Sequence, residues 1–461
     1  TYTRKILFTG NDVTQDHVLR REMRQFEGAW TSDNSIEAGK VRLERLGYFK
    51  EVNVETIPVV GTEDQIDIVY SVDEETTGSV GGNIGYSDFG LMLGFNLQEQ
   101  NFLGTGNTVG IGINKNIYSE MYNLSFMNPY ATKDGVSLGY NVYFRETDYG
   151  EFNVANYLTN SNGFGAQFGY PTSDITRLGF NVTYDKTDID VGTLPALEIY
   201  DFVSAEGNIF ETLSVQFSWQ RVTLNRGLFP TAGSSTVISL STTVPGSDLS
   251  YYRSSIRQRY YRPLSSNFVF GFSGELGYLD AYGETEETPF FQNFYAGGPR
   301  SLRGFESNTL GPRSTDAPCY EFNYEEKTCP NLIDTDGDGE LDSPYINPYA
   351  NSTSRYRDRP IGGNIKVEGS MQLIFKLPFI EDQRSLRSAF FFDFGNVFSD
   401  NCKDYQINCY KPALEDLRYS YGVGVTWITG FGPLSLAISK PTNAGPQERT
   451  EEFQFTVGNV F

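Results

Sequence analysis

The feature that most limits what this chain can fold into is an alternation of apolar and polar residues with a period of two. It begins near Thr77 and comes in segments of about ten residues separated by turn residues, as at 136–145, 178–185 and 421–427. Nowhere does the sequence approach the roughly 18 consecutive apolar residues that a transmembrane helix requires. If the chain meets a membrane, it must therefore do so as a closed β-barrel, whose strands alternate between lipid and lumen.

Aromatic residues distinguish this pattern from that of a soluble fold. The average composition would suit a soluble protein, but the 461 residues include 30 Tyr, 35 Phe and 47 Gly, and the aromatic residues gather at segment ends, as in interface girdles. A soluble β-sandwich is the alternative, and its strands would be shorter and richer in aliphatic residues. We count roughly sixteen segments, an even number as bacterial barrels prefer. The sequence therefore predicts an antiparallel transmembrane β-barrel over residues 76–461.

Residues 1–75 have a different pattern, which predicts a compact α+β module. A short strand around Ile6 and Phe8 precedes helices over about 14–23 and 33–46, and further strands run near 52–54 and 66–70. Thr1 stands in the middle of a domain with no signal segment before it, so we expect further domains upstream.

Two long connections interrupt the barrel pattern, at about 282–361 and 399–415, and long loops alternating with short turns place the long loops outside the cell. The four cysteines lie in polar stretches within them, as Cys319 with Cys329 and Cys402 with Cys409. This spacing predicts two local disulfides in an oxidising compartment. A zinc site of all four thiolates is the alternative, although neither pair has CxxC spacing.

Other candidate chemistry is weak. Asp334, Asp336 and Asp338 copy the start of an EF-hand calcium loop, but Tyr345 takes the place of the bidentate Glu, so a flexible acidic loop is favoured and no metal or cofactor is predicted. His17 is the sole histidine, and the sequence lacks HExxH, GxSxG and phosphate-loop motifs, so we predict no enzyme. A formal net charge of −22 argues against nucleic-acid binding.

Several motifs carry a family resemblance. Residues 1–75 resemble a POTRA domain through their element order and the stretches RLGYF at 45–49 and VNV at 52–54. The remainder resembles the Omp85 family through NFLGTGN at 101–107, FYAGG at 294–298, SLRGF at 301–305, FDFGNVF at 392–398 and a terminal Phe461. The order and spacing of these motifs are specific, whereas a terminal Phe or an RGF tripeptide alone is not.

The resemblance implies a latch inside the barrel. In the family, the loop that carries Arg303, Gly304 and Phe305 folds back into the lumen, and its arginine meets acidic or polar side chains on the inner wall. Strand alternation aims Asp393 inward, and Glu368 and Gln372 share an inner face. This sequence departs from the family at Gln372, where the family usually has an acid.

The resemblance also implies a weak seam where the last strand closes on the first. The first strand, 78–89, is weakened by glycines, and the last, 452–461, carries aromatic residues and one glycine near its end. The seam candidates are Gly81, Gly82, Gly85, Phe453, Phe455, Gly458 and Phe461. An open seam would expose unpaired backbone groups that template an incoming strand.

The function implied is the folding and insertion of other barrel proteins into the outer membrane of a Gram-negative cell, with the POTRA domain in the periplasm and capturing extended clients. Expected partners are unfolded outer-membrane proteins, accessory assembly lipoproteins and outer-membrane lipid. A polypeptide translocation pore of the same superfamily is the alternative. A general porin is disfavoured because it would carry no POTRA module.

Overall fold

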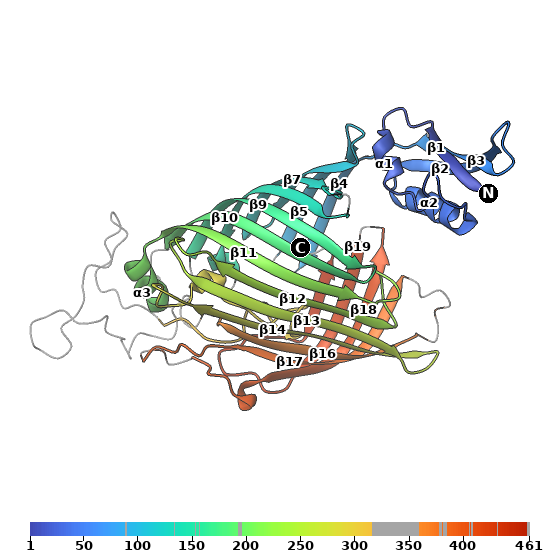
Figure 1. The fold of residues 1–461 in the computed structure, drawn as a ribbon. Coiled ribbons are helices and arrows are strands. Elements are labelled where there is room, and N and C mark those ends of the chain that lie inside the picture. Colours follow the sequence, from blue (N-terminus) through green and yellow to red (C-terminus); the bar gives the residue numbers. More distant parts are fainter. Residues whose placement is uncertain are drawn as a thin grey trace, which may run out of the picture.

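A computed structural model of the chain describes residues 1–87, 90–132, 134–152, 154–155, 157–191, 196–315, 359–377, 380, 385–404, 406, 409–430 and 432–458. These residues form a small α+β module beside one end of a closed β-barrel (Figure 1). The fold class predicted from the sequence is confirmed.

The module contains β1 (Tyr2–Thr9), α1 (Asp16–Arg20), α2 (Asp33–Arg45), β2 (Phe49–Pro58) and β3 (Gln65–Glu74), in the predicted order. β3 lies between β1, to which it is parallel, and β2, to which it is antiparallel. The Ser32 side chain caps α2 by accepting from the Ser35 amide. α1 has five residues and is shorter than predicted. Both helices pack on one sheet face, where Leu19, Leu43 and Ile68 are fully buried.

The described part of the barrel contains sixteen strands, closed in an antiparallel ring. They are β4 (Gly78–Ser87), β5 (Gly90–Phe102), β6 (Asn107–Lys115), β7 (Ser119–Asn128), β8 (Ser137–Asp148), β9 (Tyr157–Ser173), β10 (Thr176–Val191), β11 (Ile209–Val222), β12 (Gly233–Thr243), β13 (Tyr251–Pro263), β14 (Phe268–Ala281), β16 (Ile365–Phe375), β17 (Leu386–Phe398), β18 (Arg418–Thr429), β19 (Gly432–Pro441) and β21 (Phe453–Val457).

Alternation decides which side chains face outward. On β8, Tyr140, Val142 and Phe144 are exposed on the outer surface, and equivalent apolar side chains are exposed on the neighbouring strands. A strand that is apolar on one face only needs lipid on that face, which agrees with the period-two pattern of the sequence. Within the described ranges, no helix is long and apolar enough to cross a membrane.

Helix α3 (Leu197–Glu206) lies at the end of the barrel far from the module (Figure 1). The sequence did not predict this helix. Its Phe202 packs with Phe210 and Phe290 in an aromatic cluster. Four further short elements are η1 (Tyr149–Phe152), η2 (Phe290–Gln292), η3 (Leu414–Asp416) and β15 (Gly304–Phe305), and a two-residue strand, β20 (Thr450–Glu451), precedes β21. β15 belongs to the long connection between β14 and β16, here called the lumenal loop.

Candidate functional site

The lumenal loop is fixed to the barrel wall by Arg303. Its guanidinium makes a bidentate pair with Asp393 on β17, with Nε–Oδ2 and Nη2–Oδ1 distances of 2.7 Å each. The Arg303 backbone amide also donates to Asp393 Oδ2, at 3.2 Å. The Asp393 side chain is fully buried and that of Arg303 is 15% exposed. A paired carboxylate with three donors is well satisfied at this depth, whereas an unpaired one would be costly.

Two neighbours complete the latch, which we define as Arg303, Asp393, Ser370 and Phe391. Arg303 Nη2 donates to Ser370 Oγ at 3.0 Å, and the guanidinium carbon lies 3.4 Å from the centre of the Phe391 ring. Phe391 and Asp393 share the inner face of β17 because they are two residues apart. The planar guanidinium can therefore stack and donate at the same time.

The structure differs from the sequence prediction in the second polar partner of Arg303. Gln372 Nε2 donates to Ser370 Oγ at 3.3 Å, so Gln372 lies one hydrogen bond away from the arginine. Glu368 accepts from Ser301 Oγ at 2.5 Å and pairs with Lys366 at 3.1 Å. Strand alternation places the side chains of Glu368, Ser370 and Gln372 on the inner face of β16. It does not show which of them lies opposite Arg303.

Gly304 and Phe305 follow the arginine and turn the loop toward the last strand. Gly304 has φ +92°, and a Cβ there would lie 3.1 Å from Ser439 Oγ. Phe305 is fully buried. The Gly304 amide donates to Gln454 Oε1 at 3.3 Å, and Gln454 Nε2 donates to the Phe305 carbonyl at 2.8 Å. Sequence reasoning missed Gln454, although its place between Phe453 and Phe455 marked it as an inward polar residue.

The seam between β21 and β4 is short. Among the described residues these strands pair at Val457 and Tyr86 alone, whereas β4 pairs with β5 over ten residues. β21 begins at Phe453, one residue later than predicted, and β20 precedes it across a break at Glu452; together we call β20 and β21 the last strand. Residues 88–89 and 459–461, including Phe461, lie outside the described residues. The first and last strands are therefore joined far less extensively than the first hairpin.

Glycines have two different roles at this seam. Gly458 has φ +79°, and a Cβ there would lie 2.5 Å from the Ile84 carbonyl oxygen, so only glycine allows this approach to β4. At Gly81 and Gly82, an added Cβ would meet its nearest atom at 3.9 and 4.0 Å, so crowding does not require glycine there. Gly85 pairs with Met92 on β5. Unrequired glycines in β4 are expected to weaken the strand.

The NFLGTGN motif forms the turn on which the module docks. Asn101 Nδ2 donates to Thr14 Oγ1 at 2.8 Å, and the Gln15 amide donates to the Gly104 carbonyl at 2.9 Å. Gly104 has φ +71°, and a Cβ there would lie 1.9 Å from the Val13 carbonyl oxygen. The motif thus has a structural role, joining the turn after β5 to the start of α1.

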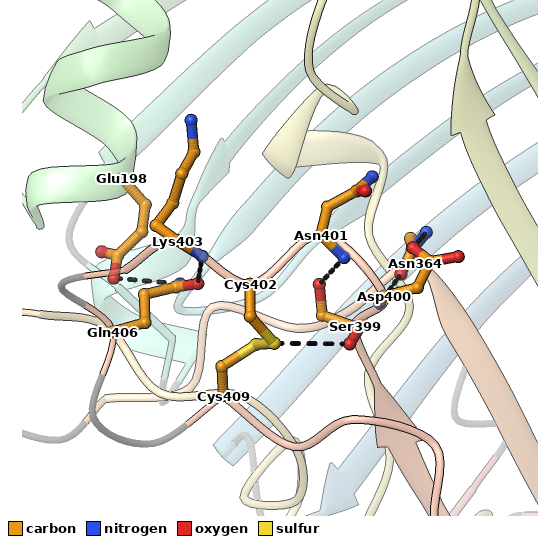
Figure 2. The surroundings of a disulfide bond; sticks show 9 residues. All are labelled: Glu198, Asn364, Ser399, Asp400, Asn401, Cys402, Lys403, Gln406 and Cys409. Carbon is orange, nitrogen blue, oxygen red and sulfur yellow. Dashed lines mark hydrogen bonds between the residues drawn. A yellow bond between two sulfur atoms is a disulfide. The ribbon is translucent and has the colours of Figure 1, made fainter.

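Cys402 and Cys409 form a disulfide in the connection between β17 and β18 (Figure 2). Lys403 N donates to Gln406 Oε1 at 2.8 Å, and Gln406 Nε2 donates to Glu198 Oε1 on α3 at 3.1 Å (Figure 2). Burial raises the pKa of the Glu198 carboxyl. These cysteines are oxidised, which contradicts a four-thiolate zinc site. Cys319, Cys329, Asp334, Asp336 and Asp338 lie outside the described residues.

A closed sixteen-stranded barrel with a lumenal loop and an α+β module at one end defines a class of outer-membrane protein. Comparison with family models places the chain within it. The Omp85 superfamily domain matches residues 101–461, and POTRA, the surface antigen variable number repeat, matches residues 1–75. The chain belongs to the Omp85 superfamily. It is a Gram-negative outer-membrane protein with its POTRA domain in the periplasm.

Relatives and solved structures agree. The chain is 31% identical to the outer membrane protein assembly factor BamA of Neisseria meningitidis serogroup B, over 100% of this chain and 56% of the relative. It is 23% identical to the sorting and assembly machinery component 50 homolog of Bos taurus, over 91% of this chain and 81% of that protein. The crystal structure of Haemophilus ducreyi BamA lacking POTRA domains 1–3 matches with a TM-score of 0.82 and 32% identity, covering 100% of this chain and 84% of that one. The chain thus spans 56% of the length of the meningococcal relative.

Proposed function

We propose that this chain folds other β-barrel proteins and inserts them into the outer membrane through the seam between β21 and β4. The observation that carries the proposal is the single described residue pair between these strands, Val457 with Tyr86. A net contribution of about 0.5–1.5 kcal/mol for each ladder hydrogen bond makes so short a seam separable by thermal motion. A parted seam offers backbone donors and acceptors to an extended client.

The POTRA domain supports the same function from the periplasmic side. β2 is an edge strand of its sheet, and its described pairing is with β3 alone. An unfolded client segment can add to such an edge by main-chain hydrogen bonds. Phe26 and Trp30, 70% and 68% exposed, provide apolar surface on which an accessory lipoprotein can dock. The proposed steps are capture, alignment at the seam and release into lipid, and none requires a catalytic group.

A seam lock tests the proposal. Tyr86→Cys with Val457→Cys places a cysteine on each strand at the described pair, and oxidation would hold β21 against β4. The matched control is Val182→Cys with Val215→Cys, an outward pair on β10 and β11 in the middle of the sheet. Each variant is reconstituted in liposomes and given a urea-unfolded outer-membrane barrel as client.

We expect client folding to stop in the oxidised seam variant, to recover with reductant, and to stay unchanged in the control. Full client folding with a quantitatively locked seam would show that insertion happens elsewhere. Ion flux without client folding in the unlocked protein would favour a translocation pore instead.

A further inference from the structure

The lumenal loop pairs with the last strand as well as with the wall. β15 and β20 form a two-stranded antiparallel ladder in which Gly304 lies opposite Glu451 and Phe305 opposite Thr450. The Glu306 amide extends this ladder by donating to the Arg449 carbonyl at 3.0 Å. We call the ladder, together with the two Gln454 side-chain bonds, the clasp.

The backbone of β21 shows which of its edges remains open. The Ser439 amide donates to the Glu452 carbonyl, and the Gly458 amide donates to the Pro433 carbonyl, both at 2.8 Å. Even-numbered residues of the last strand therefore bond to β19, and strand alternation turns the backbone groups of Phe453, Phe455 and Val457 to the opposite edge. Val457 meets Tyr86 there. The edge at Phe453 and Phe455 lies between the clasp and β4.

The described part of β4 ends short of the clasp. Because Val457 pairs with Tyr86, Ser87 lies level with Thr456, and Ser87 already pairs with Gly90 across the hairpin to β5. The outer end of the last strand thus extends beyond the first strand. Its free edge there is covered by β15, a segment about 150 residues away in the sequence.

The clasp is connected to the latch and to the turn at 442–449, between β19 and β20. Gly304 directly follows Arg303, so latch and clasp occupy consecutive residues of one loop. Arg313 of the same loop donates to the Gln447 carbonyl at 3.0 Å, and the Arg449 amide donates to Thr309 Oγ1 at 3.0 Å. Movement of the loop away from the wall would therefore strain the clasp. Movement of the loop away from β20 would likewise strain the latch.

We propose that the clasp sets the outer limit of the edge with which an incoming strand can pair, so that the lumenal loop must leave β20 before a client strand pairs along the full last strand. This inference rests on the proposed function. A transmembrane strand needs about 9–11 residues, whereas the described part of β21 has five. A client strand that grows outward from Val457 meets β15 at Glu451. The ligand is an extended peptide with alternating apolar and polar side chains.

A disulfide across the clasp can distinguish initial capture of the client strand from completion of client folding. Glu306 and Arg449 lie opposite each other, form an ion pair at 3.3 Å and are partly exposed at 34% and 48%, so Glu306→Cys with Arg449→Cys can be oxidised with little disturbance of the core. A photo-crosslinking amino acid at Phe455 reports client capture. The probe is a urea-unfolded eight-stranded outer-membrane barrel added to the full chain in liposomes.

We expect the oxidised clasp variant to retain crosslinking from position 455 while client folding is lost, because the disulfide holds β15 on β20. Reductant should restore the rate. Client folding at the full rate with the clasp oxidised overturns the inference but leaves the proposed function standing. Loss of both crosslinking and folding in the unlocked protein overturns the proposed function itself.

A second variant weakens the clasp instead of locking it, and so tests whether release of β15 from β20 exposes the edge to the client. Gln454→Leu removes both side-chain bonds of the clasp, so we expect crosslinking to the client from a photo-crosslinking residue at Thr450 to increase by about tenfold. The matched control is Gln216→Leu, an inward glutamine on β11 that donates to Ser239 Oγ at 2.7 Å on the far wall. Equal crosslinking from position 450 in Gln454→Leu and in the unsubstituted chain would contradict the clasp.

Discussion

The barrel holds its strands together in two contrasting ways. β17 pairs along most of its length with β16 on one side and β18 on the other, and it carries the buried Asp393 to which the lumenal loop is fixed. β21 and β4 meet at one described residue pair, with Gly458 at the point of approach. The difference teaches that the latch is anchored on continuous wall, so the proposed opening of the seam would leave the Arg303–Asp393 pair in place.

The latch should give the largest effect. Arg303→Glu puts two carboxylates together in a buried site, and removing one partner of a buried pair costs about 3–5 kcal/mol. We expect a large loss of client folding, and a smaller one for Arg303→Lys, which keeps the charge but loses the planar fork. Adding Asp393→Arg should partly restore the Glu variant. Normal folding of clients by Arg303→Glu would show that the wall does not need the latch.

Backbone strain at the seam should affect closure of the seam but not the stability of the barrel. Gly458→Ala forces a Cβ against the Ile84 carbonyl in left-handed backbone, at a cost of about 1–2 kcal/mol. We expect slower oxidative crosslinking between Tyr86→Cys and Val457→Cys, with an unchanged melting temperature of the barrel. Gly82→Ala has open space for its Cβ and serves as the matched control. A lowered melting temperature would mean that the seam bears the fold's stability.

The disulfides should matter less to the barrel than the latch or the seam. Cys402→Ser with Cys409→Ser opens one loop, and because the bridge closes a short segment we expect at most about 2–3 kcal/mol, confined to that loop and α3. Hydrogen exchange of α3 should rise while exchange of β17 stays unchanged. Mass mapping after alkylation without reductant should also find Cys319 joined to Cys329. Free thiols in either loop would contradict that bridge.

A smaller, pH-dependent effect is expected at Glu198. Its carboxyl is buried against the Thr315 amide, and its pKa is raised by that burial. A raised folded-state pKa stabilises the docked helix below the unfolded pKa and loses this contribution as the pH rises through the folded value. Protection factors of the α3 amides, which compare each exchange rate with the intrinsic rate at the same pH, should therefore be larger at acidic than at alkaline pH. Glu198→Gln should remove the difference, and persistence of the difference would assign it to another group.

Much of this arrangement followed from local pattern. Alternation is a property of neighbouring residues, so the strands, the inward direction of Asp393 and the order of the POTRA elements could be predicted from the sequence. The second polar partner of Arg303 could not, because Ser370 and Gln372 share one face and the loop's path alone decides between them. Gln454 was missed for the same reason. The docking role of Asn101 required knowledge of where Thr14 lies, a contact 87 residues away.

The Asn101 turn also connects the orientation of the periplasmic domain to the first hairpin of the barrel. The chain passes from β3 into β4 through residues 75–77, and the Gly104 carbonyl and Asn101 amide hold the domain at the turn that follows β5. The domain is therefore connected to both strands of the first hairpin. It joins β4 through the covalent chain and the end of β5 through hydrogen bonds. A change in the orientation of the domain relative to the barrel would therefore act on the first hairpin through the covalent chain and through these hydrogen bonds.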